Sequence, residues 1–471
     1  MHKQIDASYN LIVIGAGSGG LVAAETAAKL GARVAMIESQ RSLGGECLHS
    51  GCVPSKALIH AARVAWAAGH SQSVGITASP TIDFRVIRQH LNQAIKTIEE
   101  NHDNDDFYQR LGVDVIHGTA AFTGRDTVAV DGRMLQAKRI IIATGSRPAV
   151  PDSPGLADGP YLTNESVFSL DSLPKSLIVI GGGPIGCELG QAFAMLGTKV
   201  TIIQSGDRLL PRDEIAAATL LQAALENMGV VIKFGATIKN TVYDDAQVSV
   251  TLTDGTVLHA QKLLVAAGRQ ANMPANLALA GIESTPRGIT VDKALRTSNK
   301  RVFAIGDCNG GPQFTHAAGE QAGIAVQNAL FGTSKQFDAS SIPWTTFSTP
   351  EIAHFGPLKS DLDTKKTVYR AHKLSYKDID KAIAEGETGY VEIITDKKQR
   401  ILSATVVGVT AAEILARIVT TPTLKQLSRG IQAYPTYALG VRQLALQATL
   451  DKLLASIPGK LIRCWVSTKF K

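Results

Sequence analysis

Residues 11–38, with the sequence LIVIGAGSGGLVAAETAAKLGARVAMIE, decide the fold of the first part of this chain. Asn10–Ile14 is a short apolar strand, and an alanine-rich helical stretch follows it to Leu30. Arg33–Ile37 is a second strand, which ends at Glu38. The pattern predicts a complete strand–turn–helix–strand unit, whose two strands lie parallel in one sheet.

Three glycines in the turn of this unit suggest what it binds. Gly15 permits a tight turn, Gly17 lets the backbone approach a pyrophosphate at the helix N-terminus, and Gly20 allows close helix packing. Glu38 at the end of the second strand can accept both hydroxyls of a ribose. The unit therefore predicts a dinucleotide site.

The same pattern returns later in the chain. Its parts are a strand at Leu177–Ile180, the glycines Gly181, Gly183 and Gly186, a helix to about Leu196 and a strand at Lys199–Ile203. Gln204 stands where the first unit has its acid. Two units predict two nucleotides, one held permanently and one exchanging. Between residues 343 and 471, alternating segments at 390–395 and 401–409 and helical patterns at 411–419 and 441–455 predict an α+β domain.

Composition excludes several classes of protein. The 471 residues carry 48 Lys+Arg and 41 Asp+Glu, a net charge of +7 that is scattered along the chain, so nucleic-acid binding is not expected. No apolar run reaches the roughly eighteen residues of a membrane span, so no membrane partner is expected. The N-terminal residues do not resemble a secretory signal, and a cytoplasmic protein is expected.

Two cysteines follow the first dinucleotide unit directly, in the run Gly44-Gly-Glu-Cys47-Leu-His-Ser-Gly-Cys52-Val-Pro-Ser-Lys56. Their spacing can close a redox disulfide across a helical turn. A metal site would need two further ligands, and none is local, so no metal ion is expected. A pair of buried packing cysteines is the alternative.

The cysteine run, both glycine turns, Ala143-Thr-Gly145 and Ala304-Ile-Gly-Asp307 stand in the order found in a known family. The sequence resembles the FAD-dependent pyridine nucleotide-disulfide oxidoreductases, such as dihydrolipoamide dehydrogenase, glutathione reductase and mercuric reductase. The resemblance implies an α/β fold with two Rossmann-like domains and a C-terminal α+β dimerisation domain in a homodimer. The implied domains are 1–150 with 271–342 for FAD, 151–270 for NAD(P) and 343–471 for the dimer interface.

The resemblance also implies a path for electrons. They pass from NAD(P)H through FAD to the Cys47–Cys52 disulfide, with Cys52 facing the flavin and Cys47 facing the substrate, while Lys56 pairs with Glu188 near the flavin. The implied FAD residues are Gly15, Gly17, Gly20, Glu38, Ser39, Gly45, Lys56, Ala120, Ala143, Thr144, Gly145, Asp307, Thr315 and His316. The implied NAD(P) residues are Gly181, Gly183, Gly186, Gln204 and Gly268.

One motif departs from the family. Members that act on disulfides carry His-Pro-Thr-x-x-Glu near the C-terminus, whereas this sequence has Tyr434-Pro-Thr-Tyr-Ala-Leu439. Thiol–disulfide exchange needs a proton shuttle near neutral pH, which a tyrosine serves poorly. Mercuric reductases are similar in having Tyr here. We therefore expect a small-molecule acceptor other than an ordinary disulfide, namely a metal ion, a quinone or a small electrophile.

Two alternatives stay open: a dihydrolipoamide dehydrogenase or glutathione-type reductase with a displaced proton shuttle, and a flavin-containing redox sensor. The sequence is expected to lack the metal-carrier domain and paired C-terminal cysteines of mercuric reductases, since Cys464 is single and is expected to pack. His49 is expected to be an ordinary loop residue. Gln204 lacks the charge that would repel a 2′-phosphate, which favours NADPH. The nearby Arg208 and Arg212 do not discriminate between NADH and NADPH.

Overall fold

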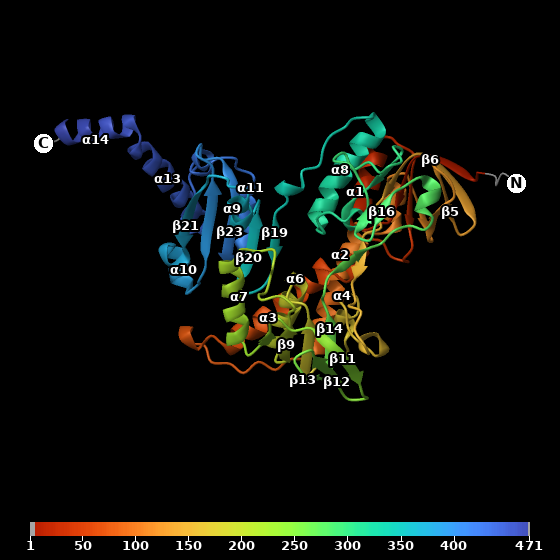
Figure 1. Ribbon diagram of the computed structural model, residues 1–471, viewed down its shortest axis with the longest axis horizontal. Coiled ribbons are helices and arrows are strands. Elements are labelled where there is room, and N and C mark those ends of the chain that lie inside the picture. The colour runs from red at the N-terminus through yellow and green to blue at the C-terminus, as the bar shows by residue number, and fades with distance from the viewer. Residues whose placement is uncertain (1–4, 470–471) are drawn as a thin grey trace. The chain divides into compact units, whose positions relative to one another are not determined.

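The computed structural model describes residues 5–469, which form two compact units (Figure 1). The first unit holds residues 5–207 and 229–339, and the second holds residues 208–228 and 340–469. In the part of the chain that the structure describes, no helix is both long and apolar enough to cross a membrane.

The first of the two large sheets in the first unit has seven strands. Its strands are β1 (Ala7–Ile14), β2 (Val34–Glu38), β3 (Val113–His117), β4 (Ala120–Phe122), β5 (Thr127–Val130), β6 (Arg133–Ile142) and β18 (Val302–Ala304). The order is β3-β2-β1-β6-β5-β4, and β18 pairs with β6 in parallel. Helices α1 (Ser18–Lys29) and α8 (Thr315–Phe331) pack together over it (Figure 1). Their small residues, such as Ala24 and Ala325, are buried, which lets the helices approach closely.

A second, four-stranded parallel sheet repeats this plan in the same unit. Its order is β10 (Val231–Lys233), β9 (Lys199–Ile203), β8 (Ser176–Ile180) and β14 (Lys262–Val265), with helix α6 (Pro184–Met195) after β8. An antiparallel sheet of β11 (Ile238–Tyr243), β12 (Val248–Leu252) and β13 (Val257–Ala260) follows in the chain. The strands β7 (Ser146–Pro148) and β15 (Arg269–Ala271) pair antiparallel. The two predicted strand–turn–helix–strand units are therefore confirmed.

The remaining helices of the first unit include those that carry the cysteine run. They are α2 (Gly45–His49), α3 (Cys52–Gly69), α4 (Phe84–Asn101) and α5 (Asp105–Arg110). Helix α7 (Ile215–Asn227), between β9 and β10 in the sequence, belongs to the second unit. The two units do not coincide with the three predicted domains, whose boundaries stay a prediction.

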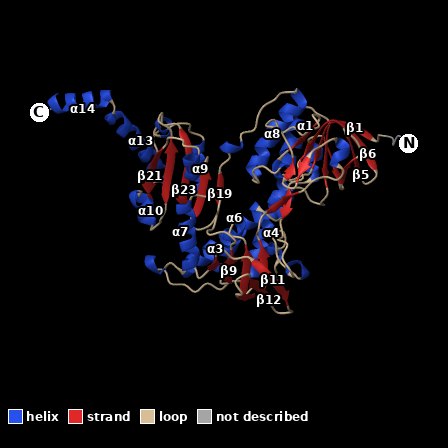
Figure 2. Cartoon of the chain, viewed as in Figure 1, coloured by secondary structure: helices blue, strands red, loops and turns tan. Residues whose placement is uncertain are grey.

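The second unit is built on a five-stranded antiparallel sheet (Figure 2). Its order is β19 (Trp344–Thr346), β20 (Glu351–Phe355), β23 (Ile401–Gly408), β22 (Tyr390–Thr395) and β21 (Arg370–Ser375). Its helices besides α7 are α9 (Lys359–Thr364), α10 (Asp380–Glu385), α11 (Ala411–Val419), α12 (Leu424–Leu427), α13 (Tyr437–Ala455) and α14 (Ile457–Lys469). The predicted α+β character is confirmed. Helix α13 begins before the expected residue 441 because Thr436 caps it, its hydroxyl accepting from the Leu439 N–H at 3.2 Å.

Candidate active site

The first glycine turn has room only for glycine at two of its positions. Gly15 has φ +102°, and a Cβ there would lie 2.4 Å from the Ala143 carbonyl oxygen. A Cβ on Gly20 would lie 1.8 Å from the Gly15 carbonyl oxygen. Gly17 is the N-cap of α1 and brings no side chain to the first N–H groups of that helix. These donors and the positive end of the helix dipole fit a pyrophosphate such as that of FAD.

Glu38 lies against this turn. Its carboxylate is buried, and one oxygen accepts from the Ala16 N–H at 2.7 Å while the other accepts from the Ser39 hydroxyl at 3.1 Å. A carboxylate has about four lone-pair positions, so it can accept further hydrogen bonds. The position therefore fits the ribose diol of a dinucleotide, as the sequence predicts.

The second glycine turn has the same geometry with a different side chain at the strand end. Gly181 has φ +110°, and its Cβ would lie 2.3 Å from the Ala266 carbonyl oxygen. The Gly182 N–H donates to the Gln204 side-chain oxygen at 2.9 Å, as Ala16 does to Glu38. A neutral amide thus takes the place of a carboxylate. Arg208, which does not decide the nucleotide in the sequence, donates from its guanidinium to the Pro211 carbonyl at 2.7 Å.

The two predicted redox cysteines share a contact with a third residue, Thr315. Cys47 lies on α2 and is half-buried, and Cys52 is the first residue of α3 and is exposed. The Thr315 hydroxyl donates to the Cys47 sulfur at 3.2 Å and lies 3.5 Å from the Cys52 sulfur. Thr315 opens α8, so two helix N-termini meet at the cysteine pair. Helix N-termini stabilise a thiolate.

The two thiols are not equivalent. A hydrogen bond from Cys47, helped by Thr315 and by the positive charge of Lys56, lowers the pKa of Cys52 to about 6. The same bond to Cys52, together with burial, raises the pKa of Cys47. Cys52 is therefore the thiolate at neutral pH, in keeping with its predicted position beside the flavin.

Lys56 and Glu188 form the ion pair that the resemblance implies. The Lys56 Nζ lies 2.7 Å from the Glu188 Oε2, joining α3 to α6, and the Glu188 side chain is only 9% exposed. The positive charge of Lys56 lowers the pKa of Cys52, and the negative charge of Glu188 raises it. The two charges therefore act in opposite directions on the stability of the Cys52 thiolate.

We expect Lys56→Met to raise the pKa of Cys52, because the variant removes a positive charge and leaves the negative charge of Glu188. The fraction of thiolate at pH 7 should fall. Ultraviolet absorbance of the reduced chain, followed against pH, measures this. Lys56→Arg keeps the charge and should leave the titration nearly unchanged, whereas Glu188→Gln should move it to lower pH. A titration that is identical in all three variants would contradict this account.

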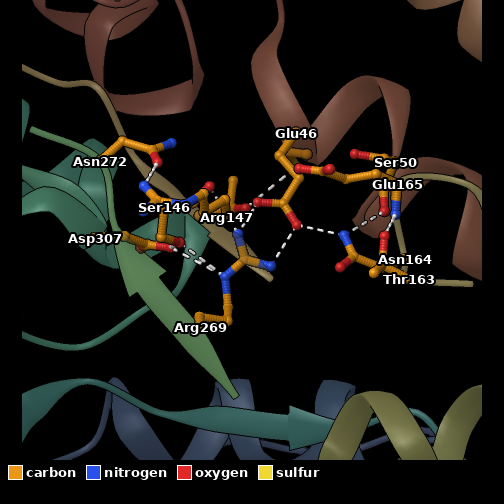
Figure 3. A network of polar contacts seen from close by, with 12 residues as sticks. Glu46, Ser50, Ser146, Arg147, Thr163, Asn164, Glu165, Arg269, Asn272 and Asp307 are labelled. Carbon is orange, nitrogen blue, oxygen red and sulfur yellow. Dashed lines mark hydrogen bonds and ion pairs between the residues drawn. The ribbon is translucent and has the colours of Figure 1, made fainter. Parts of the chain in front are cut away.

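A network of charged side chains joins the cysteine loop to Asp307 (Figure 3). Arg269 on β15 forms a bidentate ion pair with Glu46, the residue before Cys47. The Arg269 Nε donates to the Ser146 hydroxyl at 2.8 Å, and Ser146 donates to the predicted ribityl ligand Asp307 at 2.5 Å. Asn164 also donates to Glu46, at 2.5 Å. The sequence did not predict this network. The signal for it was Glu46, an acid between Gly45 and Cys47 that needs a partner.

The other predicted residues take the following places. Ala120 begins β4 and is buried, Ala143, Thr144 and Gly145 follow β6, and Gly268 precedes β15. The Thr144 hydroxyl donates to the Asn272 carbonyl at 2.7 Å. The His316 ring stacks on Phe314 at 5.4 Å between ring centroids. His49, which was expected in a loop, is the last residue of α2, and its ring donates to the Leu43 carbonyl at 2.7 Å. Among residues 5–469, no three His, Cys, Asp or Glu side chains are grouped as a metal site.

Tyr434 and Cys464 belong to the second unit. Tyr434 is 70% exposed, and its hydrogen bond with the Asp380 carboxylate raises the pKa of the phenol. Cys464 is exposed on α14, beside a Trp465 that is 59% exposed. Among residues 5–469 of this one chain nothing covers Cys464, so the expectation that it packs is not met there.

Comparison with known proteins decides the family. Residues 9–322 match the model of the pyridine nucleotide-disulphide oxidoreductases, and residues 342–445 match the dimerisation domain of the same family. The chain belongs to the pyridine nucleotide-disulphide oxidoreductases. The predicted resemblance and fold class are confirmed. The family is FAD-dependent and uses a pyridine nucleotide, and its dimerisation domain indicates a homodimer.

Relatives within this family carry different activities. The chain is 34% identical over 415 residues to a mercuric reductase of Bacillus cereus, covering 86% of this chain but only 66% of that protein. It is 31% identical to a dihydrolipoyl dehydrogenase of Halobacterium salinarum, over 94% of this chain and 97% of that one. Among solved structures, the chain resembles a copper(II) complex of the HOCl-induced flavoprotein disulfide reductase RclA from Escherichia coli, with a TM-score of 0.82 and 27% identity. The match covers 93% of this chain and 99% of the RclA chain.

Proposed function

We propose that this flavoenzyme carries electrons from NADPH through Cys47 and Cys52 to a metal ion, or else to a quinone or small electrophile, and not to an ordinary disulfide. The observation that carries the proposal is the pair Tyr434 and Leu439 in place of the histidine and glutamate of the family. The mercuric reductase relatives and the copper(II) complex of RclA support a metal ion as the acceptor class.

Different residues serve different steps of the proposed electron transfer. The first glycine turn, Glu38 and Asp307 would hold FAD, which would supply the two-electron chemistry between the nicotinamide and the Cys47–Cys52 disulfide. Cys52 would be the thiolate on the flavin side, and Lys56 and Glu188 set the charge there. The Cys47 thiol and the Cys52 thiolate can then give up two electrons, release one proton and close the disulfide again, which reduces one mercuric ion to the metal or two copper(II) ions to copper(I). Tyr434 donates a hydrogen bond or ligates a soft metal at the acceptor side.

A dihydrolipoyl dehydrogenase is the second candidate. The chain covers 97% of the Halobacterium salinarum enzyme, against 66% of the Bacillus cereus mercuric reductase. A panel of mercuric, cupric, quinone, lipoamide and glutathione disulfide acceptors, each with NADH and NADPH, separates the two. Turnover of the metals or the quinone with little turnover of either disulfide would support the proposal, and the reverse would refute it. Failure with every acceptor would favour the redox sensor.

We expect Gln204→Glu to shift the enzyme from NADPH toward NADH. The amide that accepts from Gly182 would become a carboxylate, which binds the ribose diol and repels a 2′-phosphate. The ratio of kcat/KM for NADPH to that for NADH should fall by about tenfold or more, the effect of roughly 1.4 kcal/mol. Arg208→Ala should change the ratio little, because Arg208 is bonded to backbone carbonyls. An unchanged ratio in Gln204→Glu would contradict the preference for NADPH.

We also propose an FAD-binding domain of residues 1–150 and 271–342, an NAD(P)-binding domain of 151–270, an interface domain of 343–471 and a cytoplasmic location. The pairing of β18 with β6 supports placing residues 271–342 with residues 1–150 in the FAD-binding domain. The thiol pair needs a reducing compartment, which supports a cytoplasmic protein.

A further inference from the structure

Helix α14 leaves its own side chains uncovered. It lies past residue 445, where the match to the dimerisation domain ends, and of its residues only Gly459 is buried. Gly459 forms an elbow with α13, because its N–H donates to the Ser456 hydroxyl at 3.2 Å and a Cβ there would lie 2.0 Å from the Leu453 carbonyl oxygen. From this elbow α14 runs away from the five-stranded sheet of its own unit (Figure 1).

The helix has an apolar face and a basic one. Ile457, Leu461 and Trp465 recur every four residues and are 76%, 66% and 59% exposed. Ile462 and Val466 widen this face. At 100° per residue, Lys460 and Arg463 fall on the opposite side of the helix. Three leucines of α13, Leu446, Leu450 and Leu453, are exposed as well. We call these exposed apolar side chains of α13 and α14 the apolar stripe.

The charge on α14 has one sign. Residues 457–469 contain Lys460, Arg463 and Lys469 and no Asp or Glu, whereas Asp451 and Lys452 are neighbours on α13. The Lys469 Nζ lies 4.5 Å from the centroid of the Trp465 ring. A tryptophan on an apolar face with lysine and arginine on the polar face is the composition of helices that lie in a bilayer interface.

We propose that α14 docks in the plane of an anionic phospholipid bilayer, with the apolar stripe among the acyl chains and its basic side chains at the lipid phosphates. A second copy of the chain is the other occupant to consider. Two copies of α14 would bring together only positive charges, since residues 457–469 contain no carboxylate to pair them, which favours the lipid. The inference is independent of the acceptor, and it concerns the bilayer surface, whereas the expectation of no membrane partner considered only spanning segments.

The test uses the full FAD-loaded protein with vesicles of phosphatidylcholine alone or with added phosphatidylglycerol. We expect co-sedimentation with the anionic vesicles at low salt, and a blue shift of tryptophan emission that is absent from Trp465→Phe. Lys460→Glu with Arg463→Glu should weaken binding by about 25-fold or more, from roughly fivefold for each basic residue at the surface. Leu461→Ser should weaken binding without changing the charge.

Lys365→Glu with Lys366→Glu is the matched control, since both lysines are exposed, lie outside the helix and give the same change of net charge. This control should bind vesicles as the wild type does. Equal loss of binding in the control, equal binding to neutral vesicles, or no binding at all would overturn the proposal. A smaller mass in sedimentation for Lys460→Glu with Arg463→Glu would also overturn it, because α14 would then contact the second subunit. Flavin reduction by NADPH should be unchanged in every variant.

Discussion

The Cys47→Ser variant is expected to show a long-wavelength thiolate-to-flavin absorption band as purified, whereas Cys52→Ser is expected to show none. Each variant should lose acceptor turnover by about 10³-fold or more, since a redox pair acts as a unit. The physical reason is the difference between the two sulfurs. Hydrogen bonds and the charge of Lys56 keep Cys52 as a thiolate, while Cys47 holds its proton.

The band should also depend on pH. A pKa lowered to about 6 means that the Cys52 thiolate is present above that pH and is lost as the pH falls through it. The serine hydroxyl in Cys47→Ser can still donate to Cys52, so the variant should titrate in the same region. Absorbance spectra at stepped pH measure this. Cys464→Ser, which removes an exposed thiol on α14, is the control and should keep full turnover. A band in Cys52→Ser instead would reverse the roles of the two thiols.

The parts of the fold that could be predicted are those fixed by neighbours in the sequence. Helix α11 occupies the predicted residues 411–419, because its apolar spacing is a local pattern. The glycines at 15 and 181 could be assigned because a tight turn between strand and helix requires their positive φ.

The contacts that could not be predicted join distant parts of the chain. Thr315 meets Cys47 across 268 residues, and Arg269 meets Glu46 across 223 residues. A pattern of apolar residues also does not reveal whether another element covers them. The expectation for Cys464 was not met within this chain for this reason, since its apolar neighbours Trp465 and Val466 are themselves exposed.

The Tyr434→Phe variant is expected to reduce its flavin at the wild-type rate but to turn over its acceptor about 10² to 10⁴ times more slowly. The bond to Asp380 raises the pKa of the phenol, so Tyr434 keeps its proton at neutral pH and acts as a donor rather than as a base. Phenylalanine can neither donate a hydrogen bond nor ligate a metal. Stopped-flow reduction and steady-state turnover separate the two steps.

Tyr369→Phe provides a matched control for this prediction. Its hydroxyl donates to the Asp363 carboxylate at 3.0 Å, and that bond raises its pKa as Asp380 does for Tyr434, yet it lies outside the Tyr434–Leu439 motif. It should leave both steps unchanged. Tyr434→His with Leu439→Glu should gain turnover of lipoamide or glutathione disulfide, because an imidazole paired with a carboxylate shuttles protons near neutral pH. If the wild type already turns over either disulfide as fast as its flavin is reduced, then another group supplies the proton and Tyr434 does not determine the acceptor.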